Sequence, residues 1–421
     1  MKKEYDIVII GGGPAGLAAA ISAYDNGTKD VLIIEREDRL GGILNQCIHN
    51  GFGLTRFKES LCGPEYAYRF IKEVEKRNIA TLTQTTVLSV DKQKNITTLN
   101  RTDGITTIKA KAIILAMGCR ERSRGALNVA GSRPAGVFSA GTAQKYINVK
   151  GYSIGKNVVI LGSGDIGLIM ARRLTLEGAK VHAVAEIMPY SSGLKRNIVQ
   201  CLKDFDIPLY LNHTVAKIHG DKRVEGVTIC QVDANKNLIA GTEKYFECDT
   251  ILFSVGLIPE NELAKGMGVP LSPKTKGAIV YQNRETLIDG VFACGNALQV
   301  HDLVDYVSDE SEIAGKSASE YVKNGKTAHD SVNVINGSNI SYVLPQKLDK
   351  AVSGNVKLYF RVSGVYKNCT IKLVSEGETI LSSRKGIVAP GEMETLYLKE
   401  EQIKLLNGDL TISLEVNDER S

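Results

Sequence analysis

The pattern of apolar and polar residues predicts alternating strands and helices over most of the chain. Short apolar runs typical of buried strands lie at Ile7–Ile10, Ile113–Met117, Lys156–Leu161, Thr250–Val255 and Val291–Cys294. Helical patterns start at Gly63-Pro64, where proline suits a first turn, and cover Leu168–Glu177 and Leu303–Val322. Residues 79–110 predict short strands with turns. This alternation indicates an α/β fold.

The pattern changes in the last part of the sequence. From Ile340 the chain alternates in short β-type runs, such as Val356–Val362 and Leu410–Val416, with turns such as Ala389-Pro390-Gly391 between them. These runs predict a small β-sandwich without a catalytic constellation. Its role is open between a docking surface and a scaffold.

The stretch from Lys3 to Glu35 has the order strand, tight turn, helix, strand. Gly11, Gly13 and Gly16 fit the pattern G-x-G-x-x-G, in which glycines make the turn, admit a pyrophosphate and let the helix pack on the strand. Glu35 ends the second strand, where an acid accepts hydrogen bonds from an adenosine ribose. The stretch therefore predicts a dinucleotide site.

A second copy of this unit begins at Lys156. One offset of 151 positions relates Gly11 to Gly162 and Glu35 to Glu186, and it also relates Gly16 to Gly167 and Gly27 to Gly178. We infer an internal repeat with two dinucleotide sites.

The second acid also indicates which dinucleotide binds there. Glu186 would repel a 2′-phosphate, and Ile187 after it carries no charge, which favours NAD(H) over its phosphorylated form. Lys195 and Arg196 further along leave the other choice open.

Composition argues against several other classes of protein. The 421 residues are 43% hydrophobic and 24% charged, enough for two or three domains, and the net charge of +5 without a dense basic block disfavours nucleic acid or membrane surfaces. Ile7–Ala23 is long enough to span a membrane, but its glycines and proline suit the nucleotide fold better, and Glu4 and Asp6 argue against a signal peptide. Eight irregularly spaced cysteines indicate a cytoplasmic protein with reduced thiols.

These motifs resemble the two-dinucleotide-binding flavoprotein oxidoreductases related to the pyridine nucleotide-disulfide reductases. The resemblance covers roughly residues 4–325 and implies FAD in the first unit and NAD(P)H in the second. Leu115–Gly118 and Phe253–Gly256 look like the two crossovers between the family's domains. We therefore expect two Rossmann-like domains, with an FAD domain at 1–120 and 256–330 split around an NAD domain at 121–255, and a C-terminal β-rich domain at 338–421.

Three longer segments resemble one branch of these proteins more closely. Gly41–Gly53, Gly162–Arg173 and Val300–Gly315 look like the oxidoreductase subunit that accompanies a glycerol-3-phosphate dehydrogenase-like protein in anaerobic bacteria. FAD/NAD subunits of amine and hydroxy-acid dehydrogenases are also similar. The resemblance implies that a partner dehydrogenase subunit carries the substrate chemistry.

The chain departs from the disulfide reductases in its cysteines. Those enzymes use two bridgeable cysteines, normally C-x-x-C or C-x-x-x-x-C, and this chain has neither. The tyrosine and glutamate of their second nucleotide helix are replaced by Asp165 and Ile169. Cys47 and His49 are candidate flavin neighbours, with a small buried hydrophobe and a solvent-facing or core histidine as the alternatives.

The motifs and the resemblance together give a set of candidate cofactor-binding residues. They are Gly11, Gly13, Pro14, Ala15, Gly16, Glu35, Arg36, Gly41, Gly42, Gly118, Gly162, Gly164, Asp165, Ile166, Gly167, Glu186, Gly256, Gly295, Asn296 and Leu303. Gly41-Gly42 has a surface turn as its alternative. Asp302 and Asp305 are interpreted as ordinary helix-start acids, and His301 has the same alternatives as His49. No metal-ligand spacing is present.

The sequence as a whole predicts an FAD-dependent oxidoreductase that passes hydride or electrons between NAD(H) and a partner dehydrogenase subunit. Nicotinamide and isoalloxazine should stack for direct transfer, and the helix from Leu303 should direct its positive end at the flavin. A stand-alone NADH-dependent flavin reductase or oxidase is one alternative. A non-catalytic nucleotide-binding subunit is the other.

Overall fold

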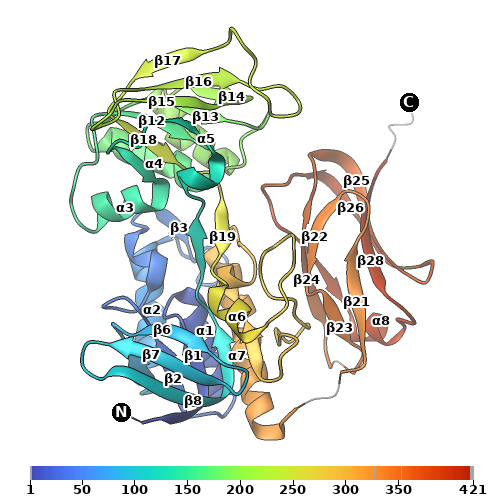
Figure 1. Ribbon diagram of the computed structural model, residues 1–421. Coiled ribbons are helices and arrows are strands. Elements are labelled where there is room, and N and C mark those ends of the chain that lie inside the picture. Colours follow the sequence, from blue (N-terminus) through green and yellow to red (C-terminus); the bar gives the residue numbers. More distant parts are fainter. Residues whose placement is uncertain (1, 327–328, 352, 418–421) are drawn as a thin grey trace. The chain divides into compact units, whose positions relative to one another are not determined.

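The computed structural model describes residues 2–326, 329–351 and 353–417. The chain forms two compact units. Unit 1 contains residues 1–45, 50–119 and 259–421, and unit 2 contains residues 46–49 and 120–258. The chain passes between the units within β9 (Cys119–Glu121) and β19 (Leu257–Pro259), directly after Gly118 and Gly256. Figure 1 colours the chain along its sequence.

The main sheet of unit 1 has the strand order β5-β2-β1-β8-β7-β6, and β20 also pairs with β8. Its strands are β1 (Glu4–Ile10), β2 (Val31–Ile34), β5 (Ala80–Leu82), β6 (Thr86–Val90), β7 (Asn95–Asn100), β8 (Gly104–Leu115) and β20 (Val291–Ala293). Strands β5, β2, β1, β8 and β20 run parallel, whereas β6 and β7 form an antiparallel ribbon on β8. The carboxyl ends of β1 and β8 therefore lie at one edge, where the first glycine turn begins.

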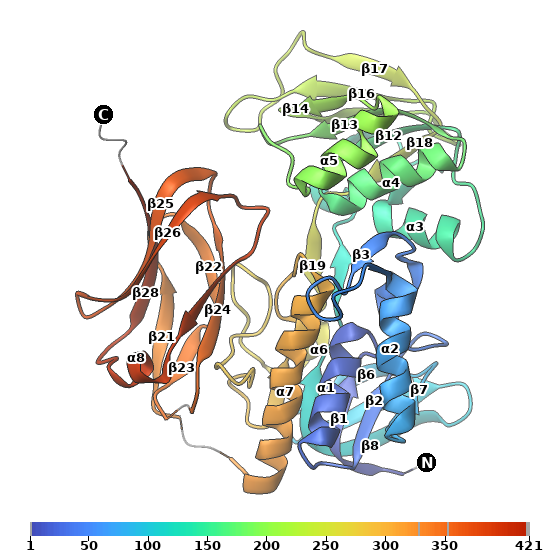
Figure 2. The same cartoon turned by 180° about the vertical axis from the view of Figure 1, so that it is seen from behind.

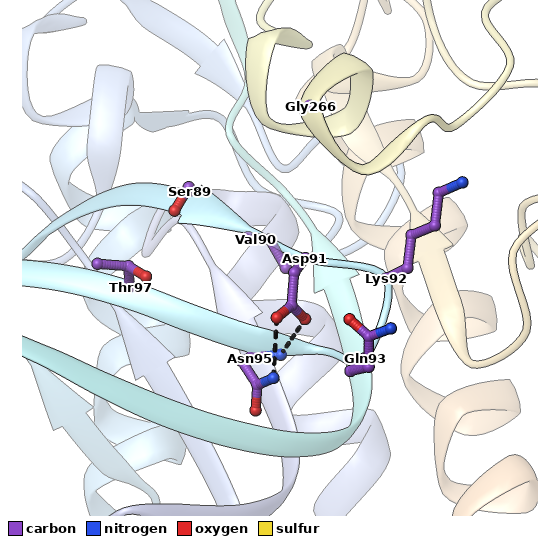
Figure 3. Close-up of a pocket in the computed structure, with 8 residues that line it drawn as sticks. All are labelled: Ser89, Val90, Asp91, Lys92, Gln93, Asn95, Thr97 and Gly266. Carbon is purple, nitrogen blue, oxygen red and sulfur yellow. Dashed lines mark hydrogen bonds between the residues drawn. The ribbon is translucent and has the colours of Figure 1, made fainter.

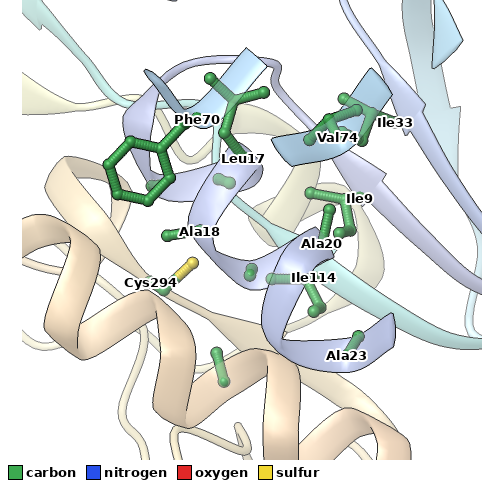
Figure 4. Packing of buried hydrophobic residues seen from close by; sticks show 14 of the residues in the cluster. Ile9, Leu17, Ala18, Ala20, Ala23, Ile33, Phe70, Val74, Ile114 and Cys294 are labelled. Carbon is green, nitrogen blue, oxygen red and sulfur yellow. The ribbon is translucent and has the colours of Figure 1, made fainter. Parts of the chain in front are cut away.

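Three helices pack on this sheet: α1 (Pro14–Asp25), α2 (Gly63–Lys76) and α7 (Val304–Asn324). Ile7 and Ile9 face α1, whereas Val8 and Ile10 face a second core on the other side, so β1 is buried on both faces. Figure 4 shows Leu17 and the small residues of α1 between the sheet and its neighbours. A Cβ on Gly315 of α7 would lie 2.2 Å from the Ala19 carbonyl oxygen, so this glycine lets α1 and α7 pack backbone to backbone.

Shorter elements complete this part of unit 1. They are η1 (Gly42–Gln46, whose last residue belongs to unit 2), β3 (Asn50–Phe52), β4 (Leu61–Cys62), α6 (Glu262–Met267) and η4 (Gly295–Ala297). The first turn of α2 contains proline, as predicted. Figure 2 shows α1, α2 and α7 from behind.

Unit 2 repeats the parallel arrangement on a smaller scale. Its five-stranded parallel sheet has the order β11-β18-β12-β13-β14, and a four-stranded sheet has the order β10-β15-β16-β17. The strands are β10 (Ala130–Gly131), β11 (Val137–Ser139), β12 (Asn157–Leu161), β13 (Lys180–Glu186), β14 (Leu209–Leu211), β15 (His213–His219), β16 (Gly226–Gln231), β17 (Lys244–Glu247) and β18 (Thr250–Phe253). The helices are η2 (Arg124–Leu127), α3 (Ala140–Asn148), α4 (Asp165–Leu176), α5 (Lys195–Cys201) and η3 (Lys203–Phe205).

The C-terminal strands of unit 1 form two sheets around a separate apolar core. The five-stranded sheet has the order β23-β21-β28-β25-β26, and the three-stranded sheet has the order β22-β24-β27. The elements are β21 (Ser331–Asn336), β22 (Ile340–Leu344), β23 (Lys347–Asp349), β24 (Val356–Val362), β25 (Tyr366–Ser375), β26 (Glu378–Val388), β27 (Glu394–Leu398), α8 (Glu400–Lys404) and β28 (Leu410–Val416). We call these strands, together with α8 and the loops that join them, the β domain. The predicted fold class, with Rossmann-like sheets and a small β-sandwich, is confirmed.

Candidate nucleotide sites at two glycine turns

The first glycine turn has a backbone that only glycine fits at two positions. Gly11 follows β1 with a φ of +111°, and a Cβ there would lie 2.4 Å from the Ala116 carbonyl oxygen at the end of β8. A Cβ on Gly16 would lie 1.8 Å from the Gly11 carbonyl oxygen. These two glycines therefore close the turn and bring α1 against the strand, as the motif predicted.

Glu35 braces this turn from the end of β2. Its side chain is buried, and its two oxygens accept hydrogen bonds from the Gly12 amide at 2.7 Å and the Glu37 amide at 2.8 Å. The carboxylate thus fixes the strand end to the glycine turn, a role that the sequence alone did not indicate. Arg36 beside it is exposed.

Gly41 and Gly42 pack against the same turn, so they are not a free surface turn. The Gly41 amide donates to the Gly12 carbonyl oxygen at 2.8 Å, and a Cβ on Gly42 would lie 2.9 Å from the Gly13 Cα. Gly295 closes the turn from another side, since a Cβ there would lie 2.6 Å from the Ala15 Cβ. The glycine turn, Glu35, Gly41-Gly42 and the distant Gly295 therefore meet beside the start of α1.

The start of α1 fits a bound pyrophosphate. A Cβ on Gly13 would have only the Gly42 Cα within 4 Å, at 3.8 Å, and no described side chain caps the helix. Pro14 occupies its first turn. There is therefore room beside Gly13 for phosphate oxygens, which the first amides of a helix bind.

The second turn repeats the first in detail. A Cβ on Gly162 would lie 1.9 Å from the Ser254 carbonyl oxygen, and one on Gly167 would lie 2.5 Å from the Gly162 carbonyl oxygen. Buried Glu186 accepts from the Ser163 amide at 3.0 Å and from the Met188 amide at 3.0 Å, the equivalents of Gly12 and Glu37. The internal repeat thus includes the bracing carboxylate.

The second unit adds contacts that sequence reasoning missed. The Ser163 hydroxyl donates to Glu186 at 2.7 Å. The Gly193 amide donates to the Ser163 carbonyl oxygen at 3.1 Å, and Gly193 follows Gly42 by the same 151 positions. Applying the offset of 151 positions to Gly42, which follows Glu35, would have identified Gly193 as a second glycine that packs against its turn.

Asp165 accepts hydrogen bonds from the segment that follows Gly193. Its Oδ1 accepts from the Leu194 amide at 2.8 Å and from Asn197 Nδ2 at 2.6 Å. Gly164 keeps room at the start of α4, since a Cβ there would meet only Ser192 Oγ, at 3.5 Å, and Ile166 beside it is half-buried. Lys195 and Arg196 are exposed on α5.

The remaining candidates lie near the crossovers and the start of α7. Gly118 and Gly256 have positive φ values of +74° and +97° with open space where a Cβ would be. Asn296 Oδ1 accepts from the His301 amide at 3.0 Å, and its Nδ2 lies 3.6 Å from Cys119 Sγ. Leu303 is the half-buried N-cap position of α7.

Asp305 lies in the first turn of α7 and Asp302 stands just before that helix, as expected of helix-start acids, but both also bind distant segments of the chain. Neither caps α7 through its side chain. Buried Asp305 accepts from the amides of Gly53, Thr55 and Arg56 at 3.1, 2.7 and 3.2 Å, so it holds the loop after β3. Asp302 accepts from the Met393 amide at 2.7 Å and pairs with Arg361, both in the β domain.

His301 is a core histidine, as its alternative stated. Its ring is buried, with Nε2 2.8 Å from Glu310 Oε2. Burial alone would raise the pKa of Glu310, but His301 and Arg284 outweigh it and hold that pKa below its ordinary value. Glu310 of α7 also forms a buried ion pair with Arg284, at 3.3 Å, which the sequence did not indicate.

Cys47 and His49 belong to a short segment of unit 2. Cys47 Sγ lies 3.8 Å from Gln144 Oε1 on α3, and Gln46 Nε2 donates to the same oxygen at 3.0 Å. Burial raises the pKa of the Cys47 thiol to about 12. His49 is half-buried. A protonated thiol is a poor nucleophile, so Cys47 is not poised for thiol chemistry.

A polar hollow of about 390 Å³ lies beside the β6–β7 turn, and neither glycine turn contributes to its lining. Figure 3 shows Asp91 there, which accepts hydrogen bonds from Asn95. Among the described residues, no group of three His, Cys, Asp or Glu side chains is placed to hold a metal ion. None of the helices in the described ranges has the length and apolar character needed to cross a membrane.

Several known proteins are similar to this chain in sequence and fold. Residues 5–310 match the family model described as pyridine nucleotide-disulphide oxidoreductase. The chain is 29% identical to a thioredoxin reductase of Listeria innocua over 352 residues, which cover 78% of this chain and 97% of that protein. It is 25% identical to an NADH dehydrogenase of Bacillus subtilis over 309 residues, which cover 70% of this chain and 54% of that protein.

A solved structure extends the agreement to three dimensions. The crystal structure of T. acidophilum thioredoxin reductase matches with a TM-score of 0.63 and 27% identity, covering 76% of this chain and 99% of that chain. Most of the similar proteins are thioredoxin reductases, so the resemblance to a glycerol-3-phosphate dehydrogenase-associated subunit remains a proposal. The chain itself belongs to the pyridine nucleotide-disulphide oxidoreductase family and is an oxidoreductase that uses FAD and a nicotinamide dinucleotide.

Proposed function

We propose that the protein passes electrons between NAD(H) and a partner dehydrogenase subunit through its FAD. The partner would be of the glycerol-3-phosphate or the amine and hydroxy-acid type. The observation that carries this proposal is a matched pair of dinucleotide turns in a chain without a redox cysteine pair. The two cysteines nearest in sequence, Cys47 and Cys62, stand 15 positions apart.

In this proposal each glycine turn holds one cofactor. Gly11, Gly13, Gly16 and Glu35 bind the adenosine diphosphate part of FAD, and Gly162–Gly167 with Glu186 bind NAD(H). FAD, when bound, accepts a hydride from the nicotinamide. Gly295, Asn296 and Leu303 would contact the flavin, and the positive N-terminal end of α7 would favour negative charge on it.

The cysteines of this chain do not suit thiol chemistry of the thioredoxin reductase kind. It needs two cysteines whose Cα atoms lie within about 7 Å and a thiolate that can attack. Burial raises the pKa of the Cys47 and Cys294 thiols to about 12, so both stay protonated at neutral pH. The electrons therefore need another acceptor or donor.

Purification from the native cell tests the proposal. We expect a dehydrogenase subunit to co-elute, and we expect the pair, rather than this chain alone, to couple NAD⁺ or NADH to substrate turnover. A chain that elutes alone and turns over NADH rapidly with oxygen or a small acceptor would contradict the partner. That result would favour a stand-alone NADH-dependent flavin reductase, which the similarity to an NADH dehydrogenase supports as the second candidate.

A further inference from the structure

The outer face of β24 contacts the start of α7 within unit 1. Alternation along β24 buries Val356, Leu358, Phe360 and Val362 in the β-domain core and turns Lys357, Tyr359 and Arg361 the other way. Lys357 Nζ lies 4.7 Å from the ring centroid of Tyr306, and the ring of Tyr359 meets that of His301 edge to face at 5.7 Å. The third residue of this face, Arg361, makes the most contacts.

Arg361 joins the β domain to the segment that precedes α7. Its Nε donates to Tyr342 Oη and its Nη1 donates to the Pro390 carbonyl oxygen, both at 3.1 Å and both within the β domain. Its Nη2 donates to the Val300 carbonyl oxygen at 3.1 Å and pairs with Asp302. The side chain is only 16% exposed, so these contacts are largely shielded from water.

The segment Val300–Asp302 is therefore held at every residue. Arg361 binds Val300 and Asp302, the Met393 amide binds the other oxygen of Asp302, and His301 is fixed by Asn296 and Glu310. Asn296 and Leu303 on either side are candidate flavin contacts. The position of this segment thus depends on the β domain, which lies beyond the part of the chain matched by the family model.

The positive charge of Arg361 changes the net charge just before α7. The Asp302 carboxylate stands just before α7 and offsets the positive N-terminal end of that helix. Arg361 neutralises the carboxylate. Without the guanidinium, an uncompensated negative charge would remain near the proposed flavin site and disfavour the additional negative charge of reduced flavin.

We propose that Arg361 is a positioning residue that fixes the segment before α7, neutralises Asp302 and thereby raises the reduction potential of the flavin. This inference rests on the proposed placement of FAD beside Asn296 and Leu303. It gives the β domain a role in tuning the cofactor rather than that of a passive scaffold.

The test compares three variants by equilibration of the bound flavin with a reference dye. Arg361→Met should shift the equilibrium about tenfold towards oxidised flavin, which for a two-electron couple is about 30 mV. Asp302→Asn should shift it in the opposite direction, because it removes the negative charge. Lys372→Met, which breaks an ion pair with Glu415 elsewhere in the β domain, should leave it unchanged.

Opposite shifts identify an electrostatic role, since simple loosening of the segment would move both variants the same way. Equal potentials in the wild type and Arg361→Met, with FAD bound, would overturn the proposal. If Arg361→Met does not fold, an unchanged or lowered potential in Asp302→Asn overturns it instead. A wild-type protein that binds no FAD would refute the proposed function itself, and so the two failures are distinguishable.

Discussion

At the scale of single residues, the two glutamates show how far the sequence predicts the site. The G-x-G-x-x-G motif and its spacing identified Glu35 and Glu186 as strand-end acids, and the structure places both there. The hydrogen bonds from Gly12 and Ser163 depend on how the turn folds back on the strand, which no local pattern specifies. Each glutamate therefore serves the turn as well as the proposed ribose contact.

We expect Glu35→Gln to weaken FAD binding at least tenfold, which corresponds to about 1.4 kcal/mol. The amide keeps one acceptor but loses the charged oxygen that receives the second backbone donor, and a buried donor left without its partner costs about 1–3 kcal/mol. Equilibrium dialysis of FAD with refolded apoprotein measures the change. Exposed Glu4→Gln on β1 is the control and should bind FAD normally. Equal affinities for both variants would refute the role of Glu35.

Glu186 should make the protein prefer NADH to NADPH by at least tenfold in the rate of flavin reduction. A buried carboxylate at the proposed ribose site repels a 2′-phosphate, and about 1.4 kcal/mol of lost binding is a factor of ten. Anaerobic stopped-flow mixing with each nucleotide gives the two rates. Equal rates would show that Lys195 or Arg196 accommodates the phosphate, and replacing both residues by alanine would then restore the preference.

Cys47→Ser should leave reduction of the flavin by NADH within about threefold of the wild-type rate, or about 0.7 kcal/mol. The thiol is half-buried, burial raises its pKa to about 12, and its Sγ lies 3.8 Å from Gln144 Oε1. Single-turnover absorbance of the flavin provides the measurement. A hundredfold loss with FAD still bound would revive a thiol mechanism.

At the scale of elements, apolar patterns located the strands and helices, but they did not reveal what the polar positions of α7 do. Asp305 and Glu310 occupy positions on a helix whose sequence is largely polar, yet both are buried and bonded to distant loops or side chains. Such partners lie far away in sequence, so periodicity cannot identify them. The glycine turns were predictable because their geometry is local.

Replacement by alanine should have different effects at Gly13 and Gly16 of the first turn. Gly13→Ala should fold normally, because its Cβ would meet nothing closer than 3.8 Å, yet it should lose FAD affinity at the point where the backbone approaches the pyrophosphate. Gly16→Ala should lower the stability of the apoprotein itself, since its Cβ would lie 1.8 Å from the Gly11 carbonyl oxygen. Thermal unfolding with and without FAD separates them. Equal apoprotein stabilities of the two variants would contradict this account.

At the scale of the whole molecule, the sequence indicated the order of the folded parts along the chain, but it did not indicate which parts contact one another. The repeat, the crossovers and the β-sandwich were visible as patterns along the chain. The placement of Gln46–His49 with unit 2, and the attachment of β24 to the segment before α7, depend on contacts between residues far apart in the chain. Neither has a local signature.

The central claim is that electrons pass between a nicotinamide and FAD without a redox-active cysteine pair. Anaerobic titration of the purified protein with NADH, followed by flavin absorbance, tests it most directly. Each hydride carries two electrons, so the equivalents of NADH consumed count the two-electron centres in the protein. We predict complete reduction of the flavin by about one equivalent of NADH per FAD, with no further uptake. Uptake of about two equivalents would reveal a second two-electron centre, as a dithiol would provide, and would contradict the account.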